Sequence, residues 1–313
     1  MKYIGIDLGG TNIVAGLIDE DGTIIKSINK PTQKERSAEL IFDDIIVMCK
    51  SLINEFKLDK TTLKGIGMGV PGSIDKKNGL IVYANNLKTS NFNVKAYLKD
   101  KLDYPVSLGN DADCAALGEV VAGSAKGYSD AIIFTLGTGV GGGIIIDGQI
   151  FSGFYPGGAE IGHQIIVKDG RPCTCGNKGC LEAYASATGL ILSATEKAMA
   201  NPDSLLYKLV DGDMSKMNAK IPFDAAQSGD AVGLEVIDSY IEHLAIGIAN
   251  TINVFKPEVI LLGGGVCKQE ENLTIPLTAK VKEMVYGKEM PTLIKIAMLG
   301  NDAGLIGAAM LNR

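Results

Sequence analysis

The chain has 313 residues, of which 46% are hydrophobic and 21% are charged. This is the composition of a folded globular protein long enough for about two domains, and it excludes a largely disordered chain. Thirty Lys and Arg against 36 Asp and Glu give a formal net charge of −6, which disfavours bulk attraction to nucleic acid or to an anionic membrane surface.

Two features argue against a membrane protein or an exported one. The apolar runs, such as residues 131–136 and 259–262, are far shorter than the ~20 residues of a membrane-spanning helix. The N-terminus places Asp7 and a glycine pair where a secretory signal peptide keeps an unbroken apolar stretch. We therefore expect a cytoplasmic protein with no membrane partner and no nucleic-acid partner.

The first part of the chain has the pattern of strands followed by helices. Residues 2–7 are rich in β-formers and are followed by Gly9-Gly10, and Asp21-Gly22 is a hairpin signal. Residues 38–56 then change to the helical period of apolar residues. The elements that we expect here are strands at residues 2–7, 13–18, 23–28, 65–70 and 106–108, and helices at residues 38–56, 94–102 and 112–122.

The same order of elements begins again at residue 131. A strand, a glycine turn, a second strand and the hairpin signal Asp147-Gly148 repeat the pattern of the N-terminus. The expected elements are strands at residues 131–136, 143–146, 149–151, 258–262 and 293–299, and helices at residues 183–200, 231–255, 273–286 and 303–311. The repeat predicts an internal duplication into two α/β lobes, with ligand bound in the cleft between them.

We expect the lobes to divide after residue 115. Residues 1–115, joined by a C-terminal helix at 300–313, form the smaller α/β lobe. Residues 116–299 form the larger α/β lobe, which contains an insertion at 153–182 where three of the cysteines gather.

Glycine turns between strands are candidate phosphate-binding sites. Backbone amides and a hydroxyl can approach phosphate oxygens there without a bulky side chain in the way, although a plain tight hairpin is the alternative interpretation. Residues 137–142 also match G-x-G-x-x-G, but a strand follows them and not the helix that a dinucleotide site requires. The turn residues concerned are Gly9, Gly10, Thr11 and Asn12 in the first copy, and Gly137, Thr138 and Gly139 in the second.

Two further residues fit a nucleotide site. Asp7, just before the first turn, could hold Mg²⁺ through water. Gly264, in the glycine run 263–265 at the end of a strand, would allow close approach of a nucleobase or ribose, and a flexible turn is the alternative interpretation of this run.

Asn110 and Asp111 stand between a strand and a helix. An Asp at such a junction is often only a helix N-cap. It can also act as the base that accepts a proton from a substrate hydroxyl, with Asn110 holding the same substrate. Phosphoryl transfer needs such a base, phosphate-binding turns and Mg²⁺, and little more.

A cysteine-rich segment follows the first of the two histidines. Thiolates on a glycine-rich knuckle can converge at about 2.3 Å from a zinc ion, and one histidine completes a tetrahedral site with no position open for water. Without an export signal, this pattern favours a structural zinc over disulfides, with three free thiols as the alternative. A zinc-dependent hydrolase needs an open metal position and is disfavoured. The predicted ligands are His163, Cys173, Cys175 and Cys180.

Glu160 and Glu182 flank this cysteine-rich segment. Carboxylates that accept two hydrogen bonds suit the vicinal hydroxyls of a sugar, whereas an isolated glutamate is usually a solvated surface residue. The second histidine, His243, lies in a helical stretch, and we expect it to be a surface or packing residue.

With these residues in place, the sequence resembles the ROK family (repressors, open reading frames, kinases) of sugar kinases. The resemblance implies an α/β duplicated actin-like ATPase (ribonuclease H-like) fold with two lobes and a cleft. It implies transfer of the ATP γ-phosphoryl group to a hexose hydroxyl, with Mg²⁺ and a structural Zn²⁺. The motifs that carry it span most of the chain, at residues 7–12, 69–72, 110–113, 136–143 and 157–186.

The resemblance also implies a role for each matching residue. Asp111 is the catalytic base, and Gly72 and Asn86 line the sugar pocket. The residues that hold the sugar are Asn110, Asp111, Glu160, His163 and Glu182, of which His163 also binds zinc. The family further implies a homodimer or a homotetramer.

Residues 180–189 are most similar to the bacterial glucokinase branch, which makes glucose the expected substrate. N-acetylmannosamine, N-acetylglucosamine, fructose and allose stay open, because loops can set the stereochemistry that is recognised at one carbon. A non-catalytic sugar-sensing regulator is the alternative of another class, and it is disfavoured because no helix-turn-helix precedes the first strand. Asp113 stands where many relatives have Asn, so the role of that Asn does not carry over.

Overall fold

The computed structural model describes residues 1–154 and 157–313 and divides the chain into two compact units. Unit 1 comprises Met1–Ile133, Gly143–Ala159 and Ala297–Arg313, and unit 2 comprises Phe134–Gly142 and Glu160–Ile296. Residues 155–156, which belong to the insertion expected at 153–182, lie outside the described residues.

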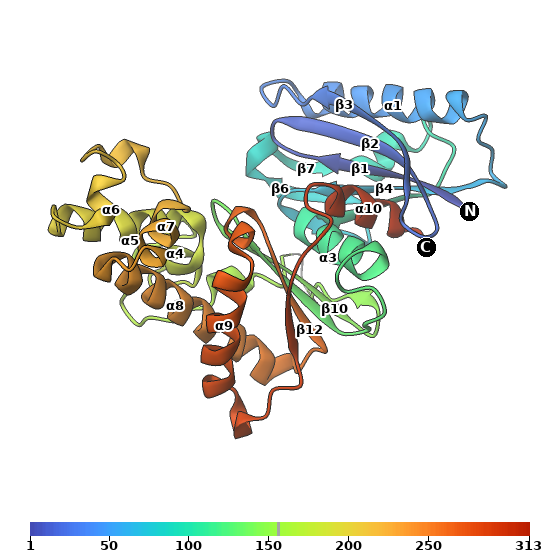
Figure 1. Cartoon of the computed structure of the whole chain (residues 1–313). Coiled ribbons are helices and arrows are strands. Elements are labelled where there is room, and N and C mark those ends of the chain that lie inside the picture. The colour runs from blue at the N-terminus through green and yellow to red at the C-terminus, as the bar shows by residue number, and fades with distance from the viewer. Residues whose placement is uncertain (155–156) are drawn as a thin grey trace. The chain divides into compact units, whose positions relative to one another are not determined.

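The first sheet has five strands in the order β3-β2-β1-β4-β8 (Figure 1). Strand β2 pairs antiparallel with both β1 and β3, whereas β4 pairs parallel with both β1 and β8. The sheet is therefore mixed and starts antiparallel, as the sequence predicts. Its strands are β1 (Lys2–Leu8), β2 (Asn12–Asp19), β3 (Ile24–Pro31), β4 (Leu63–Val70) and β8 (Val106–Asn110).

Helices cover both faces of this sheet. Alternate residues of β1, Ile4 and Ile6, join a core cluster with Phe42 of α1 (Ala38–Glu55). Tyr3 of β1 joins a second cluster with Leu305 of α10. Because side chains alternate between the faces of a strand, α1 and α10 lie on opposite faces. Helix α3 (Asp111–Ala122) packs against α10 (Asp302–Met310).

The second sheet repeats the first, in the order β11-β10-β9-β12-β13. Each position matches its counterpart in the first sheet in sequence order, which confirms the predicted duplication. This arrangement is that of the actin-like ATPase fold. Its strands are β9 (Ala131–Leu136), β10 (Val140–Ile146), β11 (Gln149–Ile150), β12 (Val259–Gly263) and β13 (Leu293–Ile296).

A third, three-stranded antiparallel sheet lies in unit 1 and was not among the predicted elements. It comprises β5 (Ser73–Asp75), β6 (Leu80–Ala84) and β7 (Thr89–Asn93), with the 3-10 turn η1 (Asn85–Leu87) between the last two. Two of these strands have five residues and one has three, so each is too short for a clear alternation of apolar residues. The helix expected at 94–102 ends early, as α2 (Val94–Leu98).

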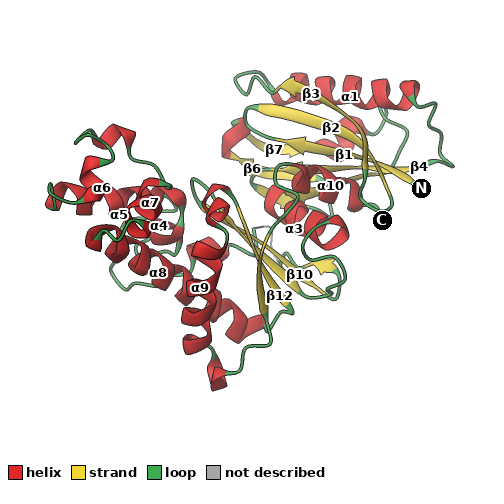
Figure 2. Cartoon of the chain, in the orientation of Figure 1, coloured by secondary structure: helices red, strands yellow, loops and turns green. Residues whose placement is uncertain are grey.

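The remaining helices form most of unit 2 (Figure 2). The helix expected at 183–200 is two helices, because Ser186 is extended and accepts a hydrogen bond from Gly189 N at 2.9 Å as the cap of the second. Helices α6 and α7 were not predicted. The helices are α4 (Glu182–Ala185), α5 (Ala187–Ala200), α6 (Leu205–Lys208), α7 (Ile221–Gln227), α8 (Ala231–Phe255) and α9 (Glu271–Met284), with 3-10 turns η2 (Ile161–His163), η3 (Met214–Lys216), η4 (Gly265–Gln269) and η5 (Tyr286–Lys288).

Unit 1 extends beyond residue 115, where the sequence suggested a boundary. Helix α3 belongs entirely to unit 1 because it packs on α10 and on β4 of the same unit. Among the described helices, none is both long and apolar enough to cross a bilayer.

The packing of α10 on the first sheet generates a prediction for Gly67. A Cβ at Gly67 would lie 1.7 Å from the carbonyl oxygen of Ala308, so Gly67→Ala must push the helix away from the sheet. We expect it to lower the free energy of unfolding by about 2–3 kcal/mol. Urea unfolding measures the loss. Gly265→Ala, where a Cβ has no neighbour within 4 Å, is the control, and equal stability of the two variants would contradict the packing described.

Candidate active site

Asn110 ends β8 and caps helix α3. Its side-chain oxygen accepts hydrogen bonds from the backbone N–H of Ala112 at 2.9 Å and of Asp113 at 3.4 Å. Its amide nitrogen donates to the carbonyl of Gly72 at 3.1 Å. Asn110, and not Asp111, is therefore the N-cap, and the Asp111 carboxylate at the start of the helix accepts a hydrogen bond from Ala112 N at 3.0 Å.

The Asp111 and Asp7 carboxylates influence each other within unit 1. Part of the Asp111 side chain is open to solvent, yet the protein around the carboxyl raises its pKa through desolvation. Asp7, near the end of β1, has its pKa raised to about 6, first by burial and then by the charge of Asp111. Asp7 lies near the end of β1 and Asp111 directly follows β8, with β4 between these two strands. Two carboxylates with raised pKa values in one region are typical of a functional site.

The first glycine turn lies directly after Asp7. Gly9 N donates to Asn12 O at 2.9 Å, which closes the turn, and Thr32 Oγ1 donates to Gly9 O at 2.7 Å. A Cβ at Gly10 would lie 3.4 Å from the Cβ of Asn86, so the turn and the predicted sugar residue are neighbours. Thr11 and Asn12 are exposed and available to a ligand.

Gly72 requires glycine. Its φ is +106°, and a Cβ there would lie 2.1 Å from the carbonyl oxygen of Tyr83. Its carbonyl accepts the Asn110 amide, so the structure brings Gly72 to the start of α3. Unit 1 thus gathers the residues predicted for it: Asp7, Gly9, Gly10, Thr11, Asn12, Gly72, Asn86, Asn110 and Asp111.

The second glycine turn lies in unit 2, beside the glycine run that ends β12. Gly264 has a φ of +98°, and a Cβ there would lie 2.3 Å from the carbonyl oxygen of Leu136, so only glycine fits. Gly137 O accepts a hydrogen bond from Ala187 N at 2.8 Å, at the start of α5. The predicted nucleotide residues Gly137, Thr138, Gly139 and Gly264 therefore lie together.

Glu182 joins the second turn to the cysteine segment. Its Oε2 accepts a hydrogen bond from Val140 N at 3.0 Å, and its Oε1 accepts one from Thr174 Oγ1 at 2.9 Å. A Cβ at Gly139 would lie 2.3 Å from Oε2, so this glycine makes room for the carboxylate. A carboxylate has about four acceptor positions, and Glu182 keeps some for a ligand.

The four predicted zinc ligands converge. The donor atoms of His163, Cys173, Cys175 and Cys180 all lie within 4.8 Å of one another. Cys173 Sγ lies 3.6 Å from His163 Nδ1, and Cys175 Sγ lies 3.7 Å from Cys180 Sγ. Two thiolates bound to one tetrahedral zinc at about 2.3 Å are about 3.8 Å apart, so the cluster fits a zinc ion. Nδ1 faces the sulfur atoms, which leaves Nε2 for other contacts.

The two remaining predicted residues differ in environment. Glu160 is exposed and directly precedes η2, the turn that contains His163. His243 stacks on Tyr184 with ring centroids 4.4 Å apart, and its Nδ1 donates to Ser239 O at 2.7 Å. His243 is thus a packing residue, as predicted.

Sequence reasoning missed an ion pair beside Asp111. Asp113 is buried, and its Oδ2 accepts a hydrogen bond from Lys76 Nζ at 2.9 Å. The same ammonium donates to Ser152 Oγ at 2.5 Å. The departure of Asp113 from the Asn of relatives was the available signal, since a buried carboxylate needs a partner.

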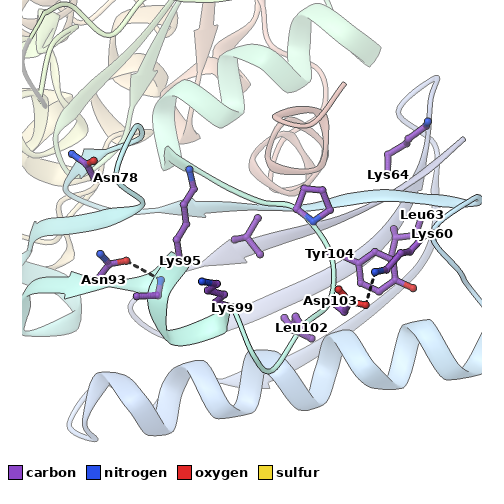
Figure 3. A pocket seen from close by; sticks show the side chains of 13 residues that line it. Lys60, Leu63, Lys64, Asn78, Asn93, Lys95, Lys99, Leu102, Asp103 and Tyr104 are labelled. Atoms are coloured by element: carbon purple, nitrogen blue, oxygen red, sulfur yellow. Dashed lines mark hydrogen bonds and ion pairs between the residues drawn. The ribbon is translucent and has the colours of Figure 1, made fainter.

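Two pockets have different linings. In unit 2, a pocket of about 280 Å³ is lined by Thr138, Thr174 and Glu182, among others. In unit 1, a pocket of about 700 Å³ is lined by four lysines (Figure 3). One of them, Lys60, pairs with Asp103 at 2.5 Å, as the dashed line in Figure 3 marks. None of the predicted site residues lines this second pocket.

Comparisons with known proteins agree with the resemblance. The model of the ROK family matches residues 3–313. A glucokinase of Halalkalibacterium halodurans is 38% identical over 99% of this chain and 94% of its own. A glucokinase of Thermotoga maritima is 37% identical over 99% of this chain and 97% of its own.

A solved structure extends the likeness to three dimensions. A ROK family glucokinase from Streptomyces griseus, crystallised with glucose and AMPPNP, is 33% identical and has a TM-score of 0.78. The match covers 99% of this chain and 99% of that one.

The raised pKa of Asp7 generates a prediction for stability. Its folded-state pKa of about 6 exceeds the ordinary 3.8, so the folded state loses stability as the pH rises from about 4 to about 6. Without nucleotide or Mg²⁺, we expect Asp7→Asn to stabilise the protein at about pH 7.5, by at most ~3 kcal/mol, and to give no gain at about pH 4. Thermal unfolding at both pH values checks this. A gain of equal size at both would contradict it.

Proposed function

Because the chain belongs to the ROK family, we propose that it is a hexokinase that transfers the γ-phosphoryl group of ATP to glucose and forms glucose 6-phosphate. The observation that carries the proposal is the start of α3, where Asn110 supplies the cap and the adjacent Asp111 carboxylate is left for chemistry beside Asp7. The full-length likeness to glucokinases supports glucose as the hexose.

Asp111 is the catalytic base of the proposed reaction. Its carboxylate accepts the proton of the sugar hydroxyl as the bond between that oxygen and the γ-phosphorus forms. The bond from the γ-phosphorus to its bridging oxygen breaks, and ADP leaves with that electron pair. The pKa of Asp111 is raised from its ordinary value by desolvation, which makes its carboxylate a better proton acceptor.

The two glycine turns bind phosphate oxygens in the proposal. Exposed Thr11 of the first turn and exposed Thr138 of the second offer hydroxyl groups beside backbone N–H donors. Asp7 is the residue that would hold Mg²⁺ through water, and the ion would offset the charge that develops on the phosphoryl oxygens. Gly264 lets the glycine run pack directly against the Leu136 backbone, and the proposal assigns this close-packed turn to the nucleoside.

The residues proposed to bind the sugar come from both units. In unit 1, the proposed residues are Gly72, Asn86, Asn110 and Asp111. In unit 2, they are Glu160, His163 and Glu182. Fixed carboxylates can each accept two hydroxyl hydrogen bonds, which suits vicinal hydroxyls on a pyranose ring.

A structural zinc is part of the proposal. Four converging ligands saturate a tetrahedral ion, so zinc would hold the loop that carries His163 and Thr174 and would not activate water. This ligand set favours a kinase with a structural metal over a zinc hydrolase. Through the Thr174 hydrogen bond, the ordered loop would also fix the position of Glu182.

Replacing Asp111 tests the assignment of the base. We expect Asp111→Asn and Asp111→Ala to lower kcat by at least about a hundredfold, because no other group takes the proton, while glucose binding persists in part. A coupled ADP-release assay measures kcat, and calorimetry measures glucose binding. Asp100→Asn, an exposed aspartate of unit 1, is the control, and near-normal turnover of the Asp111 variants would refute the assignment.

A hexose panel tests the substrate. We expect glucose to give the highest kcat/KM among glucose, N-acetylglucosamine, N-acetylmannosamine, fructose and allose, measured as ADP release. A higher kcat/KM with another of these sugars would contradict glucose as the preferred substrate and would make that sugar the substrate. No ADP release with any of them, together with sugar binding, would favour the sugar-sensing regulator.

Metal removal tests the zinc site. We expect the purified protein to contain one zinc per chain and Cys175→Ser to lose most of it, with a lower Tm and weaker glucose binding, because the loop that carries His163 is released. Elemental analysis and thermal unfolding measure both effects. Cys267→Ala, a buried cysteine outside the cluster, should keep its zinc, and a zinc-free protein with full activity would exclude the structural role.

A further inference from the structure

The ion pair between Lys76 and Asp113 joins three segments of unit 1. Lys76 lies between β5 and β6, Asp113 lies in the first turn of α3, and Ser152 follows β11. The Lys76 ammonium bonds Asp113 Oδ2 at 2.9 Å and Ser152 Oγ at 2.5 Å. The Asp113 side chain is only 7% exposed and that of Lys76 is 30% exposed, so water screens the pair poorly.

Asp113 is two residues from Asp111 in the same helical turn. If Asp113 were ionised without a partner, its charge would oppose ionisation of Asp111. The Lys76 ammonium cancels that charge at close range. A neutral Asn at this position would need no such partner, and the lysine therefore accounts for how this chain accommodates an acid there.

We propose that Lys76 is a positioning residue for the phosphoryl transfer, which neutralises Asp113 and so leaves Asp111 and Asp7 as the uncompensated carboxylates at this end of the sheet. This inference rests on the proposed function, since it assigns Lys76 an effect on the catalytic base. Lys76 touches neither substrate nor the reacting atoms in this role.

Four charged groups from three elements act on this turn. Asp7 comes from β1, Lys76 from the segment between β5 and β6, and Asp111 and Asp113 from α3. All four act electrostatically on the buried thiol of Cys114, which shows that they share one region of unit 1. Desolvation raises the pKa of Asp113 above its ordinary value, the charge and hydrogen bond of Lys76 offset part of this rise, and the charge of Asp111 adds to it. The Lys95 ammonium donates to the carbonyl of Lys76 at 3.3 Å.

The pH dependence of kcat/KM for glucose separates this role from a purely structural one. Lys76→Met leaves the negative charge of Asp113 uncompensated. The acidic limb of the pH profile, where kcat/KM falls as the pH is lowered, should therefore move to higher pH. Asp113→Asn leaves an uncompensated positive charge, so the limb should move to lower pH. Each shift should be about half a pH unit or more. The double variant restores neutrality, and its limb should return to within about 0.2 pH units of the wild type.

Two controls accompany the three variants. Lys77→Met removes an exposed lysine from the same turn and should leave the limb in place. Thermal unfolding of each variant shows whether it folds. If Lys76→Met fails to fold, Asp113→Asn and the double variant still decide the question, since the first should move the limb and the second should not.

The results distinguish this inference from the proposed function. Opposite shifts with restoration in the double variant support the role of Lys76. An active wild type whose limb stays fixed in Lys76→Met and Asp113→Asn, or moves in the same direction in both, overturns the role alone. A wild type that phosphorylates no hexose overturns the proposed function, and the role of Lys76 with it.

Discussion

The Asn110 cap is the interaction on which the proposed chemistry of unit 1 depends. One side chain accepts hydrogen bonds from two N–H groups of α3 and donates to Gly72, so it fixes the junction of β8 and α3. Because Asn110 supplies the cap, the carboxylate of Asp111 is not used to cap the helix. The same junction then sets Asp111 near Asp7 and places Asp113 where Lys76 reaches it.

Unit 2 uses a carboxylate in an analogous way. Glu182 accepts one hydrogen bond from the backbone of the glycine turn and one from Thr174 of the cysteine segment. A structural zinc would therefore act on the turn as well as on its own loop, through a single side chain. In both units, a polar side chain that looks like a simple ligand residue in the sequence also holds the backbone around it.

Much of this organisation could be predicted from the sequence, for identifiable reasons. The duplication was visible because glycine turns and Asp-Gly hairpins recur in the same order. The convergence of His163 with three cysteines was visible because the cysteine spacing is specific. The β5–β7 sheet was missed because its strands are too short for a clear alternation of residues, and Ser186 was missed as a break because a helical pattern continues on both sides of it. Lys76 was missed because a lone lysine between two short strands carries no pattern. The cytoplasmic location and the oligomeric state stay predictions.

The glycine-lined contact between α10 and the first sheet has a consequence for biosynthesis. Leu305 of α10 joins a core cluster with Tyr3, Ile18 and Val121. The backbone oxygens of Leu305 and Ala308 fit against Gly5 and Gly67. In the order of synthesis, Gly5 and Gly67 precede unit 2, and Leu305 and Ala308 follow it. One apolar face of the first sheet therefore stays uncovered until unit 2 has been synthesised. A nascent chain would most need a chaperone during this interval.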